Sequence, residues 1–292
     1  MKAYAIVKPN CRELANHLLN YLSIYAYGLE TGVRVRNLSF IEWHRYFNLK
    51  IQESFLTRMI ASLPILHGVW KAAYKLYGSY LIRFCKKCVR LTLGITTYLP
   101  PTRALLAPEN GCETTYFIGW HFRNPVGLEK YREALVAAFT PHQNIFKRIE
   151  SILAPLRGKQ LIGVHLRQEP YRGFKDGGFL VSPTRVRRIV DEYLHEKNLN
   201  ATDIALVVVS DKKVDPTTFH GLTIHTQYGN DVTSLFLLSK CTVVIGTNST
   251  FSNLSAWFGN VPHLVTTNEP MDWAHYASVT TYFENKYATF AQ

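Results

Sequence analysis

The chain has 292 residues, of which 47% are hydrophobic and 18% are charged, as in a folded globular protein. This composition excludes long disordered segments, and the length suits two domains of ordinary size or one large α/β domain. Lysine and arginine outnumber aspartate and glutamate by 33 to 21, and the net charge of +12 indicates an anionic partner: nucleic acid, a membrane face or a phosphorylated small molecule.

The five cysteines are too sparse to indicate a disulfide framework. Cys85 and Cys88 form one C-x-x-C pair, and no second pair lies near enough to complete a zinc site. We therefore expect reduced thiols, a cytoplasmic location and no bound metal. No apolar run approaches the roughly 20 residues that span a bilayer, so we expect a chain that is soluble or peripheral on the cytoplasmic membrane face.

The chain opens with the pattern of a β-α-β unit. Residues 3–7 predict a strand, because their apolar run is too short for the core of a signal peptide. Residues 13–31 carry apolar side chains at helical spacing, and Gly32 is expected to end this helix. Residues 33–37, VRVRN, predict the second strand.

A strongly basic segment follows, with no acidic residue from Ser54 to Pro108. Its basic residues are Arg58, Lys71, Lys75, Arg83, Lys86, Lys87, Arg90 and Arg103. At about 100° per residue, the apolar side chains of residues 70–91 fall on one face and the basic ones on the other, which predicts an amphipathic helix. The basic face is either merely solvated or docks on anionic lipid, where each basic residue contributes about 1 kcal/mol.

Two further helices are expected at residues 127–139 and 141–153, and the segment APLRGKQ then predicts a domain boundary that divides the chain into residues 1–155 and 156–292. The second half alternates strands and helices. Strands are predicted at 160–166, 204–210, 222–225, 242–246 and 263–266, and helices at 183–197, at 232–240 and from Ser249. Continuous apolar strands alternating with helices indicate a parallel sheet covered on both faces.

Three of these strands end in polar residues. The clusters are His165 with Arg167, Ser210 with Asp211, and Asn248 with Ser249 and Thr250. In an open α/β sheet the carboxyl ends of parallel strands share the edge at which ligands bind. Ser249 and Thr250 are also typical helix caps, and a helix start binds anions through its unsatisfied N–H groups and positive dipole. Beside Arg167 this start would form a diphosphate site, although simple capping and a solvated strand end remain open.

The segment HLRQEPY resembles the H-x-R-x-x-D-Y motif of the GDP-fucose-dependent fucosyltransferases, which include the glycosyltransferase family 11 α-1,2-fucosyltransferases, the α-1,6 enzymes and the protein O-fucosyltransferases. SDK resembles their acidic strand end, Asp231 precedes a helix ending in LLSKC, and TNSTFSNLSAWFGNVP resembles their N-S-T-F-S segment. ELANHLLNYLSIYAYGLETG resembles the G-x-x-G-N-Q opening, with Asn16 at the asparagine. The resemblance is dense from Ile162 to Pro262.

The resemblance implies an α/β fold of the GT-B type: two Rossmann-like halves, an acceptor-side domain at 1–155 and a GDP-sugar-binding domain with a parallel sheet at 156–292. It implies an inverting, metal-independent glycosyltransferase that moves fucose from GDP-fucose to a hydroxyl of a glycan or glycolipid acceptor. GDP-fucose is then a donor substrate, and no cofactor is expected. The chain has no D-x-D sequence that would hold a divalent cation on a diphosphate.

The resemblance also assigns roles to residues. Arg167 would grip the β-phosphate and neutralise the departing GDP, His165 would lie against the nucleoside, and Asp231 would accept hydrogen bonds from guanine. The remaining donor-binding positions are Ser249, Thr250 and Phe251, which would hold the phosphates, Asn248 beside them, and Asn16, which would face the sugar or acceptor. The candidates for catalysis are Arg167, Glu169, Asp211 and His17, the last three as possible general bases among which the sequence does not decide.

The sequence departs from the family pattern at several of these positions. Gln168 stands where the family often has a second arginine, Pro170 where it usually has aspartate, and His17 where it has glutamine. Three alternatives therefore stay open: a transferase for another GDP-sugar, an inactive nucleotide-sugar-binding protein, and a basic nucleic-acid-binding module. Nucleic acid is not expected, because the chain lacks helix-turn-helix, RNP and zinc-finger signatures and its basic cluster lies away from the strand ends.

Overall fold

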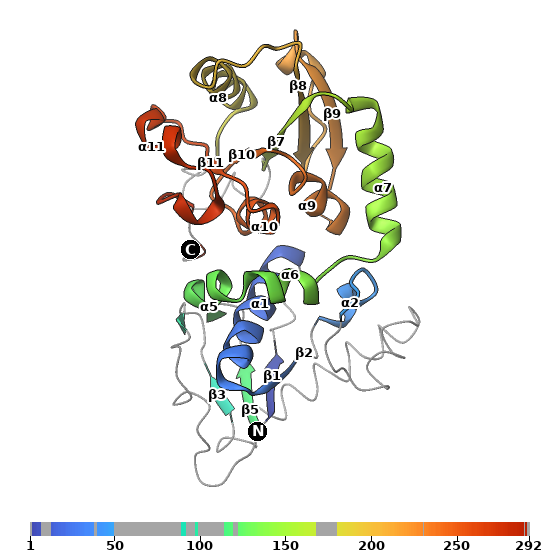
Figure 1. Ribbon diagram of the computed structural model, residues 1–292, viewed down its shortest axis with the longest axis vertical. Coiled ribbons are helices and arrows are strands. Elements are labelled where there is room, and N and C mark those ends of the chain that lie inside the picture. The colour runs from blue at the N-terminus through green and yellow to red at the C-terminus, as the bar shows by residue number, and fades with distance from the viewer. Residues whose placement is uncertain are drawn as a thin grey trace. The chain divides into compact units, whose positions relative to one another are not determined.

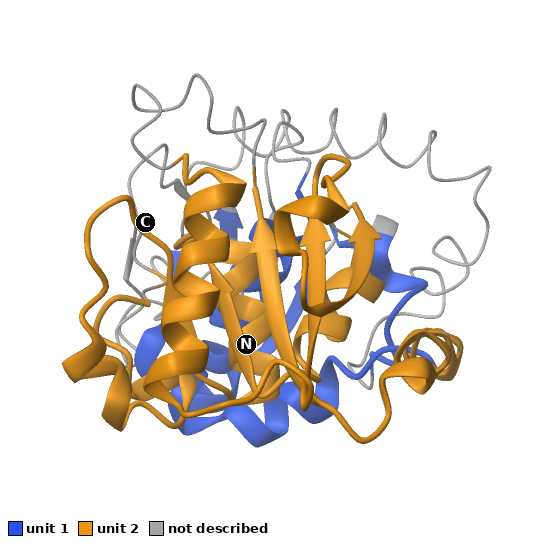
Figure 2. Ribbon diagram, turned by 90° about the horizontal axis from the view of Figure 1, so that it is seen from above, with its two compact units in different colours: residues 1–142, 291–292 blue, residues 143–290 orange. Residues whose placement is uncertain are grey.

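Two parallel β-sheets organise the computed structural model, which describes residues 2–6, 13–37, 40–49, 89–91, 97–98, 114–118, 122–167, 180–229, 231–288 and 290. The chain divides into two compact units, one of residues 1–142 with 291–292 and the other of residues 143–290 (Figures 1 and 2). Each unit has its own sheet covered by helices. The α/β fold class predicted from the sequence is confirmed.

The first unit contains a four-stranded parallel sheet of order β2-β1-β5-β3. Its strands are β1 (Lys2–Ile6), β2 (Arg34–Asn37), β3 (Val89–Leu91) and β5 (Thr114–Ile118). Helix α1 (Leu14–Thr31) links β1 to β2 and ends at Gly32, which adopts a left-handed conformation and donates its N–H to Gly28 O. A Cβ at Gly28 would lie 2.5 Å from Val35 Cγ2, so glycine lets α1 approach β2. The predicted β-α-β unit is thus confirmed.

The prediction of a helix up to residue 91 is wrong at its end. Val89–Leu91 form strand β3, which pairs with β5 at the edge of the sheet. The backbone of β3 makes its hydrogen bonds with β5 instead of within a helix. Tertiary contacts of this kind routinely override a local helical pattern. Residues 50–88, which hold most of the predicted basic helix, lie outside the described residues.

Shorter elements complete the described part of this unit. They are α2 (Ile41–His44), the parallel pair β4 (Thr97–Tyr98) and β6 (Phe122–Arg123), α5 (Pro125–Lys130) and α6 (Arg132–Ala138). The helix predicted over 127–139 is therefore two helices. Asn124 caps the first by accepting the N–H of Gly127, and Tyr131 leaves the helical conformation with φ −107° and ψ 18° before the second begins.

The second unit contains a five-stranded parallel sheet of order β11-β10-β7-β8-β9. The strands are β7 (Gln160–Leu166), β8 (Ile204–Ser210), β9 (Thr223–Tyr228), β10 (Val243–Gly246) and β11 (His263–Val265). The helices are α7 (Gln143–Leu153), α8 (Pro183–Glu196), α9 (Val232–Leu238), α10 (Thr250–Gly259) and α11 (Trp273–Ser278). Among the described residues of this unit, single-turn 3₁₀ segments lie at Ala154–Leu156, Pro216–Phe219 and Tyr282–Glu284.

Alternate residues of the central strands point to opposite faces of this sheet. Ile162 and Val164 of β7 join a core with Ile189 and Val190 of α8. Gly163 lies on the other face, where an added Cβ would meet Leu238 Cδ2 at 3.0 Å. Helices thus cover both faces, and all seven residues of β8 are buried as the continuous apolar run predicted.

Helix α7 packs within the second unit. It contacts α9, and Lys240 Nζ lies 5.5 Å from the centre of the Phe146 ring. The unit boundary therefore falls between His142 and Gln143, whereas the boundary expected after residue 155 groups α7 with the first half.

Candidate functional site

The carboxyl ends of the second unit's strands bring three predicted polar clusters to one edge of the sheet. Strand β7 lies between β10 and β8, with His165 in register with Gly246 and Leu166 in register with Ser210. The strand ends that carry Arg167, Asp211 and Asn248 are therefore neighbours. This is the edge at which open parallel sheets bind ligands.

The His165 side chain is buried and contacts helix α10. Its exposed fraction is 1%, and Nδ1 lies 2.7 Å from Ser252 Oγ. The Phe251 ring lies against the imidazole with 4.8 Å between ring centres and a tilt of 31°. His165 and Phe251 thus form a buried contact between the end of β7 and the first turn of α10.

Arg167 follows β7 directly and is half-buried. The two-residue spacing from His165 places both residues on the same side of the extended chain, the side that faces α9 and α10. Arg167 therefore follows β7 at the sheet edge, next to the end of β10 from which the chain leads into α10. Gln168, Glu169 and Pro170 lie outside the described residues.

The start of α10 has the geometry of an anion-binding helix terminus. Ser249 is in an extended conformation, and its Oγ accepts the N–H of Ser252 at 3.2 Å, so the predicted cap is confirmed. Thr250 is the first helical residue rather than a cap. In an α-helix the first N–H groups have no intrahelical acceptor and the dipole is positive, so those of Thr250 and Phe251 suit an anion.

Asn248 is tied to both α10 and the C-terminal segment. Its Oδ1 accepts from Asn253 Nδ2 at 2.7 Å, and its Nδ2 donates to Tyr287 O at 3.1 Å. Because both ends of the amide are engaged, the Asn248 side chain fixes the loop between β10 and α10. A contact with the phosphates would therefore come from the loop backbone more readily than from this amide.

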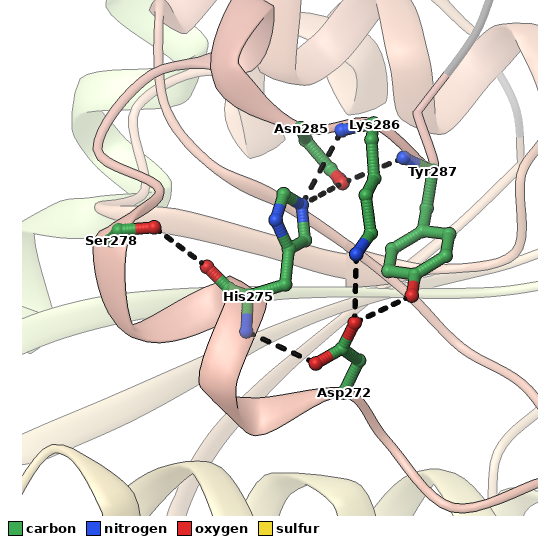
Figure 3. Close-up of polar contacts among 6 residues, drawn as sticks. All are labelled: Asp272, His275, Ser278, Asn285, Lys286 and Tyr287. Carbon is green, nitrogen blue, oxygen red and sulfur yellow. Dashed lines mark hydrogen bonds and ion pairs between the residues drawn. The ribbon is translucent and has the colours of Figure 1, made fainter.

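The C-terminal segment that binds Asn248 is itself stabilised by hydrogen bonds and an ion pair among its own residues (Figure 3). Tyr287 Oη donates to Asp272 Oδ2 at 2.7 Å, and Lys286 Nζ lies 2.9 Å from the same oxygen. These two contacts and the capped N–H of His275 hold the pKa of Asp272 well below its ordinary value. Asn285 Nδ2 also donates to His263 O. The cluster braces the ends of β10 and β11, and no sequence motif pointed to it.

His263 is a buried histidine that sequence reasoning missed. Nδ1 lies 3.0 Å from Asn253 Oδ1, and Nε2 lies 3.3 Å from Gly246 O. Burial is the main cause that lowers its pKa to about 3, and the nearby His165 contributes to this shift. The ring is therefore neutral at physiological pH and serves as a polar link between β10, β11 and α10.

Asp231 and Asp211 lie at the ends of the neighbouring strands. Asp231 caps α9, because Oδ1 accepts the N–H of Ser234 at 2.8 Å, and its carboxylate remains exposed. Asp211 is half-buried directly after β8, beside Ser210, whose Oγ accepts the N–H of Lys212. Asp211 thus lies at the carboxyl edge of the sheet, as its strand-end position predicted, and Asp231 begins α9 after the end of the neighbouring strand β9.

The predicted residues of the first unit lie in the first turn of α1. Asn16 is half-buried and donates to Glu13 Oε2 at 3.3 Å. His17 is 4% exposed, and its ring centre lies 4.4 Å from that of Trp43. The same unit buries Arg123 to 1% exposure at the end of β6, a polar residue that sequence reasoning did not single out.

Within the part of the chain that the structure describes, no group of three or more histidine, cysteine, aspartate or glutamate side chains is arranged to hold a metal ion. In the same residues, none of the helices combines the length and the apolar character needed to cross a membrane.

No protein-family model matches the chain, and no curated protein sequence does. Solved structures do match, and they include a fucosyltransferase and proteins solved with GDP or GDP-fucose. A mutant of Arabidopsis thaliana FUT1 in complex with GDP matches with a TM-score of 0.54 at 12% identity, over 93% of this chain and 71% of that one.

Two further structures agree with this match. POFUT1 in complex with GDP gives a TM-score of 0.52 at 12% identity, over 92% of this chain and 98% of that one. The fucosyltransferase NodZ from Bradyrhizobium gives 0.51 at 12% identity, over 93% and 96%. At such identities the likeness defines the fold, and it extends across these fucosyltransferases without singling out glycosyltransferase family 11.

Proposed function

We propose that this chain is a glycosyltransferase that moves fucose from GDP-fucose to a hydroxyl of a glycan or glycolipid acceptor, with inversion and without a metal. The observation that carries the proposal is the sheet edge of the second unit. There Arg167 and the start of α10 follow adjacent strands, within a fold shared with proteins solved with GDP or GDP-fucose.

Each group at this edge has a chemistry that suits one part of the donor. The Arg167 guanidinium can make two parallel hydrogen bonds to a phosphate, and the N–H groups of Thr250 and Phe251 can hold a second set of oxygens. The exposed Asp231 carboxylate can accept from the N1–H and N2–H₂ of guanine while it caps α9. Together these groups take the charge-neutralising role that a divalent cation has in other sugar transfers.

The proposed reaction is a single displacement. The acceptor oxygen forms a bond to the anomeric carbon of fucose as the bond from that carbon to the β-phosphate oxygen breaks, and the electron pair leaves with GDP. The acceptor proton passes to a general base within hydrogen-bond reach. Negative charge grows on the diphosphate in the transition state, so Arg167 and α10 stabilise that state. Glu169, Asp211 and His17 remain the candidate bases.

A GDP-release assay with GDP-fucose and a panel of glycan acceptors tests the proposal. Arg167→Ala should lower the rate by about 10²-fold or more, as expected when a preorganised donor to a developing anion is removed. Arg187→Ala is the matched control, because Arg187 lies on α8 and pairs with Asp191 at 2.9 Å. A rate within a few-fold of wild type for Arg167→Ala would contradict the assignment.

The same assay separates the alternatives. Turnover of another GDP-sugar in preference to GDP-fucose would indicate a different donor on the same fold. Binding of GDP-fucose without release of GDP under any acceptor would indicate an inactive nucleotide-sugar-binding protein. A salt-dependent shift of labelled nucleic acid, unaffected by GDP, would favour the nucleic-acid-binding module.

We also propose that the basic segment of residues 54–108 attaches the protein to the anionic, cytoplasmic face of a membrane. The support is the charge pattern, because each basic residue near such a surface contributes about 1 kcal/mol. A lipid-linked glycan would fit an enzyme placed there.

A further inference from the structure

A chain of buried hydroxyl groups joins the two elements of the proposed donor site. His165 Nδ1 lies 2.7 Å from Ser252 Oγ, and Ser252 Oγ lies 3.0 Å from Ser249 Oγ. The exposed fractions of His165, Ser249 and Ser252 are 1%, 2% and 0%. Strand β7 and the cap of α10 are therefore linked by a relay of three side chains, which we call the His165–Ser252–Ser249 relay.

Counting hydrogen atoms gives the relay a direction. Ser249 Oγ already accepts the N–H of Ser252, so its own hydrogen is available to donate to Ser252 Oγ. The Ser252 hydrogen then donates to His165 Nδ1. In the opposite direction the Ser249 hydrogen would need an acceptor outside the relay, and the described residues show no hydrogen bond from Ser249 Oγ to one; a buried hydroxyl left unsatisfied is unfavourable. Because Nδ1 accepts in the favoured direction, a neutral His165 ring carries its proton on Nε2.

Close packing around the relay keeps its three side chains in contact. An added Cβ at Gly246 would lie 2.9 Å from Ser252 Oγ and 3.1 Å from both His165 Cβ and His165 O. Only a glycine on β10 therefore lets the turn of α10 approach β7 this closely. On the other side the Phe251 ring contacts the imidazole at 4.8 Å between centres.

We propose that Ser252 is a positioning residue of the donor site. It locks His165 in one tautomer and so fixes the end of β7, which carries Arg167, against the start of α10. The guanidinium and the N–H groups of Thr250 and Phe251 can then meet one diphosphate without first paying to order two separate elements. The inference rests on the proposed function and gives His165 a role as an anchor of α10 rather than as a donor contact.

Ser252→Ala tests the inference, with Ser255→Ala as a matched control. Ser255 lies in the same helix, is fully buried and donates to Phe251 O at 2.9 Å, but it takes no part in the relay. GDP affinity by isothermal titration calorimetry should fall about tenfold in Ser252→Ala, the change that follows loss of one buried hydrogen bond. In Ser255→Ala it should change less than about twofold.

A second pair of variants distinguishes an anchor from a ligand contact. The amide of His165→Asn occupies the place of Nδ1 and can still meet Ser252, whereas the amide of His165→Gln reaches the place of Nε2. We expect His165→Asn to retain more GDP affinity than His165→Gln. The reverse order, or an equal loss in Ser255→Ala and Ser252→Ala, would overturn the proposal.

Nitrogen NMR of histidine-labelled protein provides a readout that does not depend on GDP. The His165 signals, assigned by their loss in His165→Gln, should report one tautomer protonated at Nε2 in the wild type and a mixture in Ser252→Ala. A mixture in both proteins would refute the relay. Absence of GDP binding by a wild type that shows the single tautomer would instead refute the proposed function and leave the relay standing as an anchor.

Discussion

Replacing Gly246 by alanine tests the close approach on which the site depends. The new Cβ would lie 2.9 Å from Ser252 Oγ and 3.1 Å from the His165 carbonyl oxygen, separations that a well-packed interior does not accommodate. Overpacking of this kind costs about 1–3 kcal/mol, whereas removing glycine from a strand interior gains about 0.5–1 kcal/mol. The difference is a net destabilisation of up to about 2.5 kcal/mol, and we expect the steric cost to exceed the gain because both Ser252 Oγ and the His165 backbone crowd the new Cβ.

Thermal unfolding followed by circular dichroism measures this change. A loss of 1 kcal/mol lowers the midpoint by about 2–4 °C in a protein domain of this size. Ser252 can yield only by rotating Oγ away from His165 and Ser249, so GDP affinity should fall together with stability. Because Ser252→Ala removes the nearest atom, the double variant should be less destabilised than the sum of the single variants by about 0.5 kcal/mol or more.

Two results would exclude a steric conflict between residue 246 and Ser252. The first is a Gly246→Ala protein with the stability and GDP affinity of the wild type, which would mean that β10 and α10 are not in close contact. The second is strict additivity of Gly246→Ala and Ser252→Ala, which would mean that the Ser252 hydroxyl is not the group in the way.

Three other predictions follow from named groups. Burial lowers the pKa of His263 from 6.5 to about 3. Between these two pH values the unfolded chain binds a proton that the folded chain does not. The free energy of unfolding should therefore fall as the pH drops below 6.5, by at most about 1.4 kcal/mol per pH unit. Urea unfolding at pH 7 and 5, where carboxylates stay ionised, should show this slope, and His263→Asn should reduce it; an unchanged slope would contradict the assignment. Asp231→Asn should keep the α9 cap, because asparagine is also a good cap, and should change the free energy of unfolding by no more than about 0.5 kcal/mol. The variant should lose the preference for GDP over inosine diphosphate, which lacks the N2 amine. A retained preference would exclude Asp231 as the guanine contact. Replacing Lys86 and Lys87 by glutamine should weaken cosedimentation with anionic vesicles but not with neutral ones, and binding that depends on neither the lipid charge nor these lysines would exclude electrostatic docking.

The strands and helices of the second unit could be predicted because their local signals agree with their packing. Strands β7 and β8 are continuous apolar runs buried on both faces, and their bounds match those expected from the sequence. Helices α8, α9 and α10 each begin after a side-chain cap, at Ser182, Asp231 and Ser249. Because hydrophobic periodicity and helix capping depend only on residues close together in the chain, both can be recognised from the sequence alone.

Other features depend on contacts between distant residues. His165 and Ser252 are 87 positions apart, and only the pairing of β7 with β10 brings them together. The strand that contains His263 is expected from the sequence, but no motif marks the histidine as a buried link to Asn253 and Gly246, and the Asp272 cluster has no motif either (Figure 3). In the first unit, Val89–Leu91 follow the periodicity of the predicted basic helix, yet pairing with β5 makes them a strand. For these residues the partner across the fold, rather than the local pattern, decides the structure.

We propose that the carboxyl edge of the second unit's sheet binds a guanosine diphosphate sugar through Arg167 and the start of α10. Isothermal titration of GDP-fucose into the wild-type protein and into Arg167→Ala, without added metal, tests it most directly. We predict binding at one site per chain in the wild type and at least a tenfold loss in the variant, as expected for removal of one charge-assisted contact worth about 1.5–3 kcal/mol. No binding to the wild type, or equal affinity in the two proteins, would show that Arg167 does not hold the donor at this edge.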